Sequence, residues 1–325
     1  MKINIKDIPA SIWFLAAVSL ALALAFISKD QYLLTLFAFA GIYVIAVSGL
    51  DLLFGYSGQI SMGHAAYYAI GAYTSALLST KLGVPVLLSM IAAMVVSGVF
   101  GIIVAFPAAK LVRHFLSLLT IAFGQMVYIF ACKAKAVTNA MAGVKRIPKL
   151  NLFGFEFRSN LSCAILILVL CVLFLIVKQR IVHSSSGRAL MAIRENVVAA
   201  DGMGINIKKY KIMAFAISAV YTGMAGALYA HIVSYISPES FQSSQSQLLM
   251  TMLLFGGMGN LAGPIIGAVI VTILNETLQG FSSYRMLIYG FIILASVLYM
   301  PKGLYGIVEK IKGLFGRRVK ADADN

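Results

Sequence analysis

A polar, glycine-rich run separates two apolar segments in the first quarter of the chain. The run reads GYSGQISMGHAAYYAIGAY and extends from Gly55 to Tyr73. The segments on either side of its turn, 32–54 and 65–78, are apolar enough for the interior of a bilayer. Polar backbone and glycine at membrane depth are tolerated only where the chain is buried in protein or lines a water-filled cavity. The run therefore predicts a membrane-embedded break of the kind from which transporters build solute pathways.

Long apolar segments recur along the rest of the chain. Hydrophobic residues make up 61% of the sequence and charged residues 11%, whereas soluble domains contain about 25% charged residues. The predicted spans are 11–27, 32–54, 64–80, 84–106, 115–132, 161–177, 211–236, 246–281 (interrupted) and 285–300. Because a spanning helix needs about 20 residues, we predict an all-α, polytopic helical membrane protein with about 8–10 transmembrane segments and broken or re-entrant helices at glycine-rich turns.

No stretch between these spans is long enough for a second folded domain, so residues 1–325 are predicted to form a single transmembrane domain. Its predicted parts are a first group of spans (11–177), a cytoplasmic loop (178–210), a second group of spans (211–300) and a cytoplasmic tail (301–325). The first apolar run is expected to be a retained helix, because a small-residue cleavage site is missing after it.

The basic residues lie mostly between the spans. The formal net charge is +15, and placing the N-terminus, the loops 107–114 and 178–210 and the tail in the cytoplasm puts most Lys and Arg on that side. This is the pattern of the positive-inside rule and favours a lipid membrane over nucleic acid as the partner. The basic loop 133–158 falls on the outer side and is the weak point of this topology.

A second glycine turn, GGMGNLAGP at 256–264, interrupts a later apolar hairpin as the turn at 55–63 interrupts the first. Each turn places a glycine directly before an amide side chain. We interpret the two hairpins as an internal repeat, which transporters use to place a site at the repeat interface, with chance similarity as the alternative. The turns carry no Lys or Arg of their own. The candidate pathway residues are Ser57, Gly58, Gln59, Ser61, Gly63, His64, Gly257, Gly259 and Asn260.

Ionisable residues inside spans are functional candidates by default. Asp51 lies just before the first turn, where backbone donors freed at the turn could satisfy it. Glu276 is expected near the membrane interface. His64 begins a helix, and its ring either hydrogen-bonds freed backbone or faces a cavity. The sequence has no series of Asp, Glu and His suited to a proton relay through the membrane.

Two stripes of small residues recur at helical spacing. They predict close helix packing, with pathway lining as the second interpretation. The residues are Ala65, Ala69, Ala72 and Ala76 in one stripe and Ala219, Gly223 and Ala227 in the other.

Motifs of catalysis and cofactor binding are missing from the sequence. There is no GxxxxGK[ST] loop for ATP and no HExxH. The GxGxxA match at 257–262 lacks a βαβ context. The four histidines are scattered, and the three cysteines have no metal-site or disulfide spacing. We therefore expect no enzyme activity, no catalytic residues, no metal and no cofactor in this chain.

The stretch between Lys178 and Lys211 mixes charged, small and apolar residues. Ser184 to Ser186 are candidate helix caps, and 189–200 is predicted to be one short amphipathic helix. Leu190, Ile193 and Val197 give this helix an apolar face, which is expected to dock on something.

Several motifs, in order, carry a resemblance that covers most of the chain from about residue 32 to 306. The chain resembles the inner-membrane permeases of ABC importers for branched-chain amino acids, the LivM-type subunit. The motifs are GYSGQISMGHAAYYAIGAY at 55–73, TIAFGQM at 120–126, GRALMAIRENVVAADGMGIN at 187–206, GGMGNLAGPIIGA at 256–268, the segment 215–241 and MPKGLYG at 300–306.

The resemblance implies one half of a two-permease pore in the bacterial inner (plasma) membrane. The implied partners are a second homologous permease subunit, two cytoplasmic ATPase subunits that use the ATP, and an extracytoplasmic solute-binding protein. The stretch 187–206 then corresponds to the helix that couples to an ATPase subunit. The implied coupling residues are Gly187, Arg188, Ala189, Ile193, Arg194, Glu195, Ala199, Ala200, Asp201 and Gly204.

The chain departs from the family in the loop TNAMAGVKRIP at 138–148. The family usually has a Gly-Gly pair there, whereas only Gly143 remains and Lys145 and Arg146 are added. Docking of the binding protein or the choice of solute could differ as a result. Leucine, isoleucine and valine are the leading solutes, with urea, short amides or another small solute as alternatives. A stand-alone secondary carrier or channel is the competing class, and a coupling stretch such as 187–206 argues against it.

Overall fold

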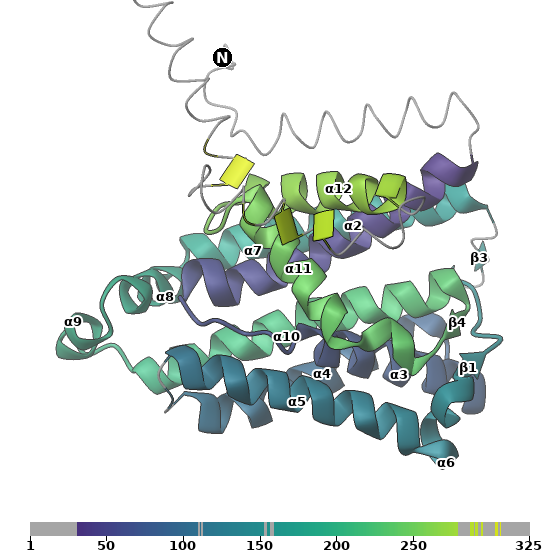
Figure 1. The fold of residues 1–325 in the computed structure, drawn as a ribbon, viewed down its shortest axis with the longest axis horizontal. Coiled ribbons are helices and arrows are strands. Elements are labelled where there is room, and N and C mark those ends of the chain that lie inside the picture. The colour runs from purple at the N-terminus through teal and green to yellow at the C-terminus, as the bar shows by residue number, and fades with distance from the viewer. Residues whose placement is uncertain are drawn as a thin grey trace, which may run out of the picture.

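The computed structural model describes residues 31–278, except 110, 112, 153, 154, 157 and 158, and isolated positions between 287 and 306. The described chain is almost entirely helical (Figure 1). Of the predicted spans, 11–27 lies outside the described residues and 285–300 is described only at isolated positions.

The helices form one elongated bundle with short irregular segments at its two ends (Figure 1). Their bounds are α2 (Gln31–Asp51), α3 (His64–Lys81), α4 (Val86–Ala108), α5 (Arg113–Lys133), α6 (Lys135–Thr138), α7 (Asn160–His183), α8 (Ser185–Glu195), α9 (Val197–Gly202), α10 (Ile207–Val233), α11 (Ser243–Gly256) and α12 (Ala262–Thr277). A π-helix (Leu52–Tyr56) continues α2, and 3-10 turns occupy Ala140–Ala142 and Pro238–Phe241. The short strands are β1 (Val144–Lys145), β2 (Asn151–Leu152), β3 (Phe155–Glu156) and β4 (Tyr235–Ile236).

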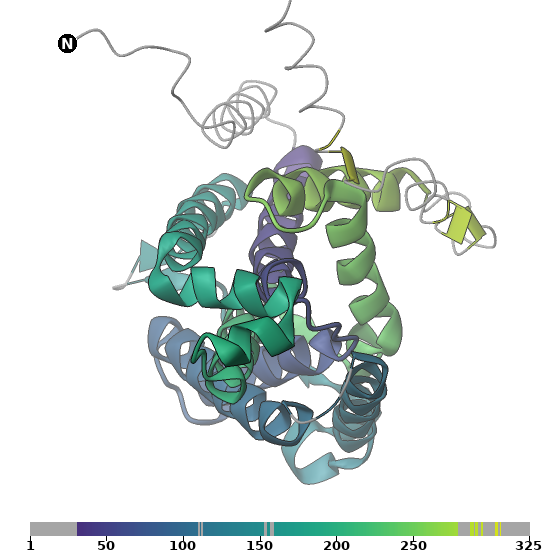
Figure 2. The same ribbon diagram turned by 90° about the vertical axis from the view of Figure 1, so that its left-hand side faces the viewer.

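Five of the described helical segments are long and apolar enough to cross a membrane. They are Gln31–Tyr56, Val86–Ala108, Phe115–Lys133, Asn160–His183 and Ile207–Val233, and Ala262–Thr277 is a shorter apolar helix. The prediction of an all-α, polytopic membrane protein is confirmed. Helices α3 and α11 are the short halves of the interrupted hairpins. Helix α3 packs against α4 and α10, whereas α11 lies at the edge of the bundle (Figure 2).

Helix α10 is the central element of the bundle and packs against α2, α3 and α4. A Cβ atom at Gly71 of α3 would overlap the backbone of Gly223, and one at Gly226 would overlap the carbonyl of Tyr68. The backbones of α3 and α10 therefore touch, which only small side chains permit. The small-residue stripes serve helix packing, as predicted.

The two long loops lie at opposite ends of the bundle. Helices α8 and α9 project from one end, whereas α6 and the strand pair β1–β4 lie at the other (Figure 1). Strands β1 and β4 are antiparallel, with Val144 opposite Ile236. Gly143, in the loop that departs from the family pattern, has φ +66° and packs directly on the carbonyl of Ile236. This arrangement is the one expected if the loops 178–210 and 133–158 face opposite sides of a membrane.

The prediction of a single helix over 189–200 is wrong. Asn196 is extended (φ −154°, ψ 111°) and separates α8 from α9. Its Oδ1 accepts hydrogen bonds from the backbone N–H of Val198 and Ala199, both at 3.0 Å, so it acts as the N-cap of a second helix. Of the three candidate caps at 184–186, Ser184 is the N-cap of α8, because its Oγ accepts from the N–H of Gly187 at 3.3 Å.

Candidate functional site

The two glycine turns meet at the carboxylate of Asp51. Asp51 is fully buried at the end of α2, immediately before the π-helix. Its Oδ1 accepts a hydrogen bond from the N–H of Gly259 at 2.7 Å. The backbone donor predicted for Asp51 therefore exists, but it comes from the second turn and not from the adjacent first one. A single π-helical turn is a frequent companion of functional sites in helices.

Lys178 of α7 supplies the opposite charge. Its Nζ lies 2.7 Å from Oδ2 of Asp51, and both side chains are completely buried. The same ammonium donates to the carbonyl of Asn260 at 3.3 Å and lies 5.8 Å from the centre of the Tyr56 ring. Three segments of the chain are thus tied together by one ion pair.

This ion pair was missed by the sequence analysis, which placed Lys178 at the start of a cytoplasmic loop. The turns carry no Lys or Arg of their own, but Lys178 binds the backbone of the second turn directly. A buried carboxylate needs a counter-charge, and Lys178 directly follows the apolar run 161–177. That position is the sequence signal that could have identified it.

Gly55 allows the two turns to touch. A Cβ atom there would overlap the Asp51 carboxylate and would lie 2.6 Å from the nitrogen of Gly259. Gly259 itself has φ +72°, in the left-handed region that favours glycine. Backbone from the first break and backbone from the second are therefore in direct contact.

Arg194 of α8 lies across both turns. Its Nη1 donates a hydrogen bond to the carbonyl of Gly55. A Cβ atom at Gly58 would lie 3.3 Å from Cγ of Arg194, and one at Gly259 would lie 2.9 Å from its Nη1. A displacement of α8 would thus be felt at both glycine turns at once.

The apolar face of α8 is already occupied by the chain itself. Leu190 and Ile193 are each only 1% exposed, and Leu190 belongs to a cluster with Leu53 and Phe215. The face predicted to dock therefore docks on the bundle through Leu190 and Ile193, whereas Val197, the third residue of that face, is 41% exposed. Exposed apolar side chains lie further out, with Val198 and Met203 both 83% exposed.

The residues implied to couple to an ATPase fall into two groups. Gly187, Ala189, Ile193 and Ala200 are buried, whereas Arg188, Arg194, Glu195, Ala199, Asp201 and Gly204 are exposed. The exposed group lies on the α8–α9 projection (Figure 1). Their role in coupling stays a prediction.

The polar side chains of the first turn bond mainly to their own segment. Ser57 Oγ donates to the carbonyl of Leu53 at 2.6 Å, and Gln59 Nε2 donates to Ser57 Oγ at 2.8 Å. Both residues are less than 5% exposed. Gln59 Oε1 has no hydrogen-bond partner in the part of the chain that the structure describes.

His64 is buried and bonded through both ring nitrogens. Its Nδ1 lies 3.2 Å from Ser61 Oγ and its Nε2 lies 2.7 Å from Ser218 Oγ of α10. Both ring nitrogens bond hydroxyl groups. The interpretation in which the ring bonds freed backbone is therefore wrong. Its interactions are those of a residue that fixes the start of α3 against α10.

Side chains of neighbouring helices accept hydrogen bonds from the backbone N–H groups at the start of α3. The N–H of Met62 donates to Thr120 Oγ1 of α5 at 3.1 Å, and the N–H of Ala65 donates to Ser246 Oγ of α11 at 2.8 Å. Gly63 packs directly on the carbonyl of Thr120. The motif TIAFGQM therefore has a structural role, since it carries the surface on which the first turn rests.

The second turn uses its amide side chain as a helix cap. Asn260 Oδ1 accepts from the N–H of Gly263 in the first turn of α12, and Asn260 Nδ2 donates to the carbonyl of Gly257 at 3.3 Å. Gly257 has φ +110°, and a Cβ atom at Gly303 of the motif MPKGLYG would lie 2.5 Å from its nitrogen. The nine candidate pathway residues thus hold the breaks in shape, and their contact with a solute stays a prediction.

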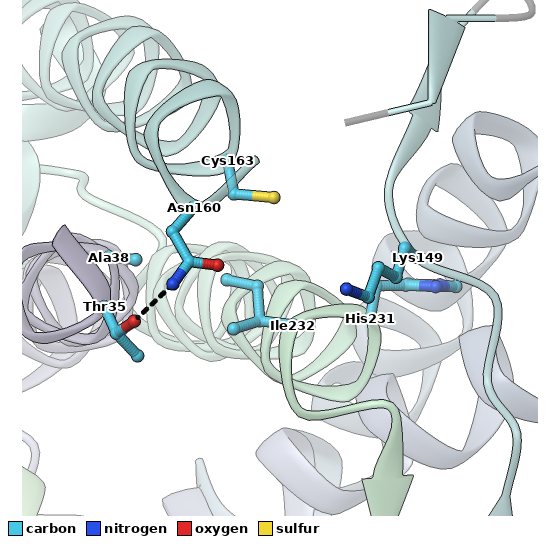
Figure 3. A pocket seen from close by; sticks show the side chains of 7 residues that line it. All are labelled: Thr35, Ala38, Lys149, Asn160, Cys163, His231 and Ile232. Atoms are coloured by element: carbon cyan, nitrogen blue, oxygen red, sulfur yellow. Dashed lines mark hydrogen bonds between the residues drawn. The ribbon is translucent and has the colours of Figure 1, made fainter. Parts of the chain in front are cut away.

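A small recess lies at the end of the bundle opposite α8. Figure 3 shows Asn160 and Cys163 on one side of it and Lys149 and His231 on the other. Asn160 Nδ2 donates to Thr35 Oγ1 at 3.2 Å, and both nitrogens of His231 are engaged, by Pro148 O at 2.7 Å and Ser75 Oγ at 2.8 Å. The hydrogen bond of Asn160 joins α7 to α2, and those of His231 join α10 to α3 and to the loop at Pro148.

Over the described residues, no group of three or more His, Cys, Asp or Glu is arranged to hold a metal ion.

Glu276 is near the end of α12 and accepts a hydrogen bond from the hydroxyl of Tyr32 at 2.7 Å. The arrangement around Asp51 holds two breaks and a projecting helix together, and its polar groups bond to one another.

The family described as branched-chain amino acid transport system / permease component matches residues 32–297. The high-affinity branched-chain amino acid transport system permease protein LivM of Salmonella typhimurium is 32% identical over 286 residues, which are 81% of this chain and 67% of that protein. The LivM protein of Escherichia coli K12 has the same identity and coverage. The LivH permease of Escherichia coli K12 is 24% identical over 83% of this chain and 93% of its own length. No solved structure matches.

Proposed function

Because the chain belongs to the family of branched-chain amino acid transport permease components, we propose that it is the transmembrane permease subunit of an ATP-driven ABC importer. In this proposal the chain moves leucine, isoleucine or valine that a solute-binding protein delivers. It acts in the bacterial inner membrane together with a second, LivH-like permease and two cytoplasmic ATPase subunits. It hydrolyses no ATP itself.

The α8–α9 projection carries this proposal. It extends beyond the end of the bundle (Figure 1) and exposes Val198 and Met203, each 83% exposed, beside charged residues. Large apolar side chains at a projecting tip are favoured where another protein covers them. A groove on a cytoplasmic ATPase subunit is the partner that the family resemblance implies, whereas a stand-alone carrier needs no such projection.

Arg194 connects this projection to the interior. It lies on the same short helix, and it contacts Gly55, Gly58 and Gly259. Packed interfaces respond to small shifts by switching between discrete arrangements. Movement of α8 with an ATPase subunit would therefore change how the two membrane-embedded breaks contact each other.

The solute assignment is supported by the names of the relatives, which are branched-chain amino acid permeases. A zwitterion with an aliphatic side chain carries no net charge, so it needs no unpaired ion in its path. The buried cation beside the turns, Lys178, is neutralised by Asp51, which is consistent with such a solute. High-affinity selection is expected in the binding protein. Urea, short amides and other small solutes are the alternatives within the same class.

Uptake into proteoliposomes tests the proposal. Vesicles that contain both permeases, both ATPase subunits and the binding protein should take up labelled leucine only with ATP, and valine should compete. Failure of leucine, isoleucine and valine, with transport of urea or a sugar, would contradict the solute but not the importer class. ATP-independent uptake by this chain alone would contradict the class.

The coupling role of α8 is tested by charge reversal. Arg194→Glu should leave assembly of the complex intact but should lower solute-stimulated ATP hydrolysis and uptake about tenfold or more, since the contact with both turns is lost. Lys209→Glu, an exposed charge reversal just after the projection, is the matched control and should change uptake less than twofold. Wild-type uptake by an assembled Arg194→Glu complex would overturn the coupling role.

The orientation in the membrane is tested by cysteine labelling. A single cysteine at Ser184 should react only with reagent supplied from the cytoplasmic side, and one at Asn151 only with reagent from outside. The basis is the basic-residue asymmetry together with the position of the two loops at opposite ends. Cytoplasmic labelling at residue 151 would invert or break the proposed topology.

A further inference from the structure

Helix α5 differs from the other long spans in what it exposes. On α4 between Leu88 and Phe106, and on α7 between Ile165 and Val177, every exposed side chain is apolar. On α5 the amide of Gln125 is exposed. Gln125 is ten residues beyond Phe115 in the span Phe115–Lys133, so it lies about 15 Å along the helix, near mid-membrane.

An exposed amide at that depth does not suit lipid. Lipid offers no hydrogen-bond partner, and an unsatisfied polar group costs several kcal/mol in hydrocarbon. Polar side chains within spans accordingly face protein or a water-filled cavity. The exposed side chains of α4 and α7 meet the requirements of a lipid-facing surface. On α5 the amide of Gln125 does not, and it lies among the exposed apolar side chains of Leu118, Ile121 and Ile129.

Helix α11 has the same property in a stronger form. Its exposed residues are Ser243, Ser244 and Gln247, and no apolar side chain of the helix is exposed to the same degree. The helix has only 14 residues. Its first two turns therefore present hydroxyl and amide groups alone.

The exposed groups of α5 and α11 lie at the same level of the bundle. Gly124 is close to Gly63, with 3.6 Å between its Cβ position and the Gly63 Cα, and Ser246 bonds to the N–H of Ala65. Gln125 and Gln247 are the residues that follow Gly124 and Ser246. Helices α5 and α11 are neighbours in the bundle (Figure 2).

We propose that Gln125, Ser243, Ser244 and Gln247, termed the α5–α11 polar face, line the water-filled path of the solute opposite the second permease. The inference rests on the proposed function and adds the surface that the solute meets. Amides and hydroxyls both donate and accept hydrogen bonds. Such a surface serves the ammonium and the carboxylate of a zwitterion equally well and holds neither strongly.

This surface differs from the pathway predicted from the sequence. The side chains of Ser57, Gln59 and His64 are buried and bonded within the chain, so they have little free capacity for a solute. The α5–α11 polar face lies directly beside them through Thr120 and Ser246. The glycine break thus supports the lining, and the exposed side chains of α5 and α11 form it.

Thiol accessibility in the assembled importer tests this inference. In a background with Cys132, Cys163 and Cys171 replaced by alanine, single cysteines are placed at Gln125, Ser244 and Gln247, and at Val95 and Leu173 as controls. A charged methanethiosulfonate needs a thiolate in contact with water, so it should modify the first three at least about tenfold faster than the controls. Ser244→Cys exchanges only oxygen for sulfur, which keeps the test valid if a glutamine variant fails to assemble.

Each outcome is decisive. Modification of the polar-face cysteines that is faster than modification of the controls supports the path. Slower modification of the same cysteines when leucine and the binding protein are added supports it as well. Modification as slow as at Val95 would overturn it, as would efficient cross-linking to the second permease without reaction with the charged reagent, because the face would then be a dry interface. The accessibility rates are measured without solute, so a wrong solute assignment would leave them unchanged.

Discussion

The two glycine turns break their helices in a similar way, yet different chemistry holds each of them. Within the first turn the side chains that bond are neutral, with Ser57, Gln59 and His64 bonded to nearby carbonyl and hydroxyl groups, and Arg194 of α8 adds one bond to the carbonyl of Gly55. The second is held through its backbone, because the N–H of Gly259 and the carbonyl of Asn260 bind the Asp51–Lys178 pair. The two turns therefore share a sequence pattern but are stabilised by different interactions.

This difference predicts which of the two turns loses more stability when it is substituted. Neutral hydrogen bonds contribute about 0.5–1.5 kcal/mol each, so the first turn should tolerate single losses. The second turn depends on two buried charges, and removal of one partner leaves the other uncompensated. Substitutions at the second turn and its anchor should therefore cost more than equivalent ones at the first.

The largest effect is expected from Asp51→Leu. It leaves the ammonium of Lys178 buried without its counter-charge, and the free energy of unfolding should fall by about 3–5 kcal/mol. Thermal unfolding of the detergent-solubilised protein and its level in the membrane measure this. Glu276→Gln, which keeps an acceptor for Tyr32, is the control and should stay within about 1 kcal/mol.

The double variant Asp51→Leu with Lys178→Met sharpens this result. Removing both charges should restore most of the stability that Asp51→Leu loses, since a buried pair replaced by apolar residues is often neutral. If the double variant were no more stable than Asp51→Leu alone, the ion pair would not be the anchor of the second turn.

A smaller effect is expected from alanine at the positive-φ glycines. Gly259→Ala places a Cβ atom 2.9 Å from Nη1 of Arg194 at φ +72°, and Gly58→Ala places one 3.3 Å from its Cγ at φ +70°. Backbone strain of about 1–2 kcal/mol applies to both, but only Gly259→Ala displaces the guanidinium from the carbonyl of Gly55. Uptake should therefore fall more for Gly259→Ala at similar loss of stability, and equal uptake would contradict this difference between the turns.

The smallest effect is expected at the side chains of the turns. Asn260→Ala removes the cap of α12 and should cost about 1 kcal/mol, whereas Asn260→Ser retains an oxygen and should cost less. Ser57→Ala loses one bond to Leu53 and leaves the donor of Gln59 unpaired, so a similar cost of about 1 kcal/mol is expected. Urea or thermal denaturation of the purified protein distinguishes these from the larger effects, and a loss above about 3 kcal/mol for either would show a role beyond local bonding.

Features set by neighbouring residues could be predicted from the sequence. The spans follow from apolar runs, the start of α3 at His64 from the end of the glycine turn, and a serine cap of α8 from the three serines at 184–186 before a helical pattern. The capping asparagine at 196 was missed, although Asn is a strong N-cap, because the apolar period continued through it. The extended backbone of Asn196 ends α8 there, although the apolar periodicity continues into α9.

The sequence by itself determined that this chain crosses a membrane several times, breaks two of its helices with glycine, and belongs to a transport family, since hydropathy and motifs are properties of short segments. Only the tertiary structure decided that Lys178 neutralises Asp51 across 127 positions of chain, that Arg194 lies across both turns, and that the amide of Gln125 faces outward. The physical reason is that partners and exposure depend on which helix faces pack together. That arrangement is fixed by contacts between α2, α7, α10 and α11 that lie far apart along the chain.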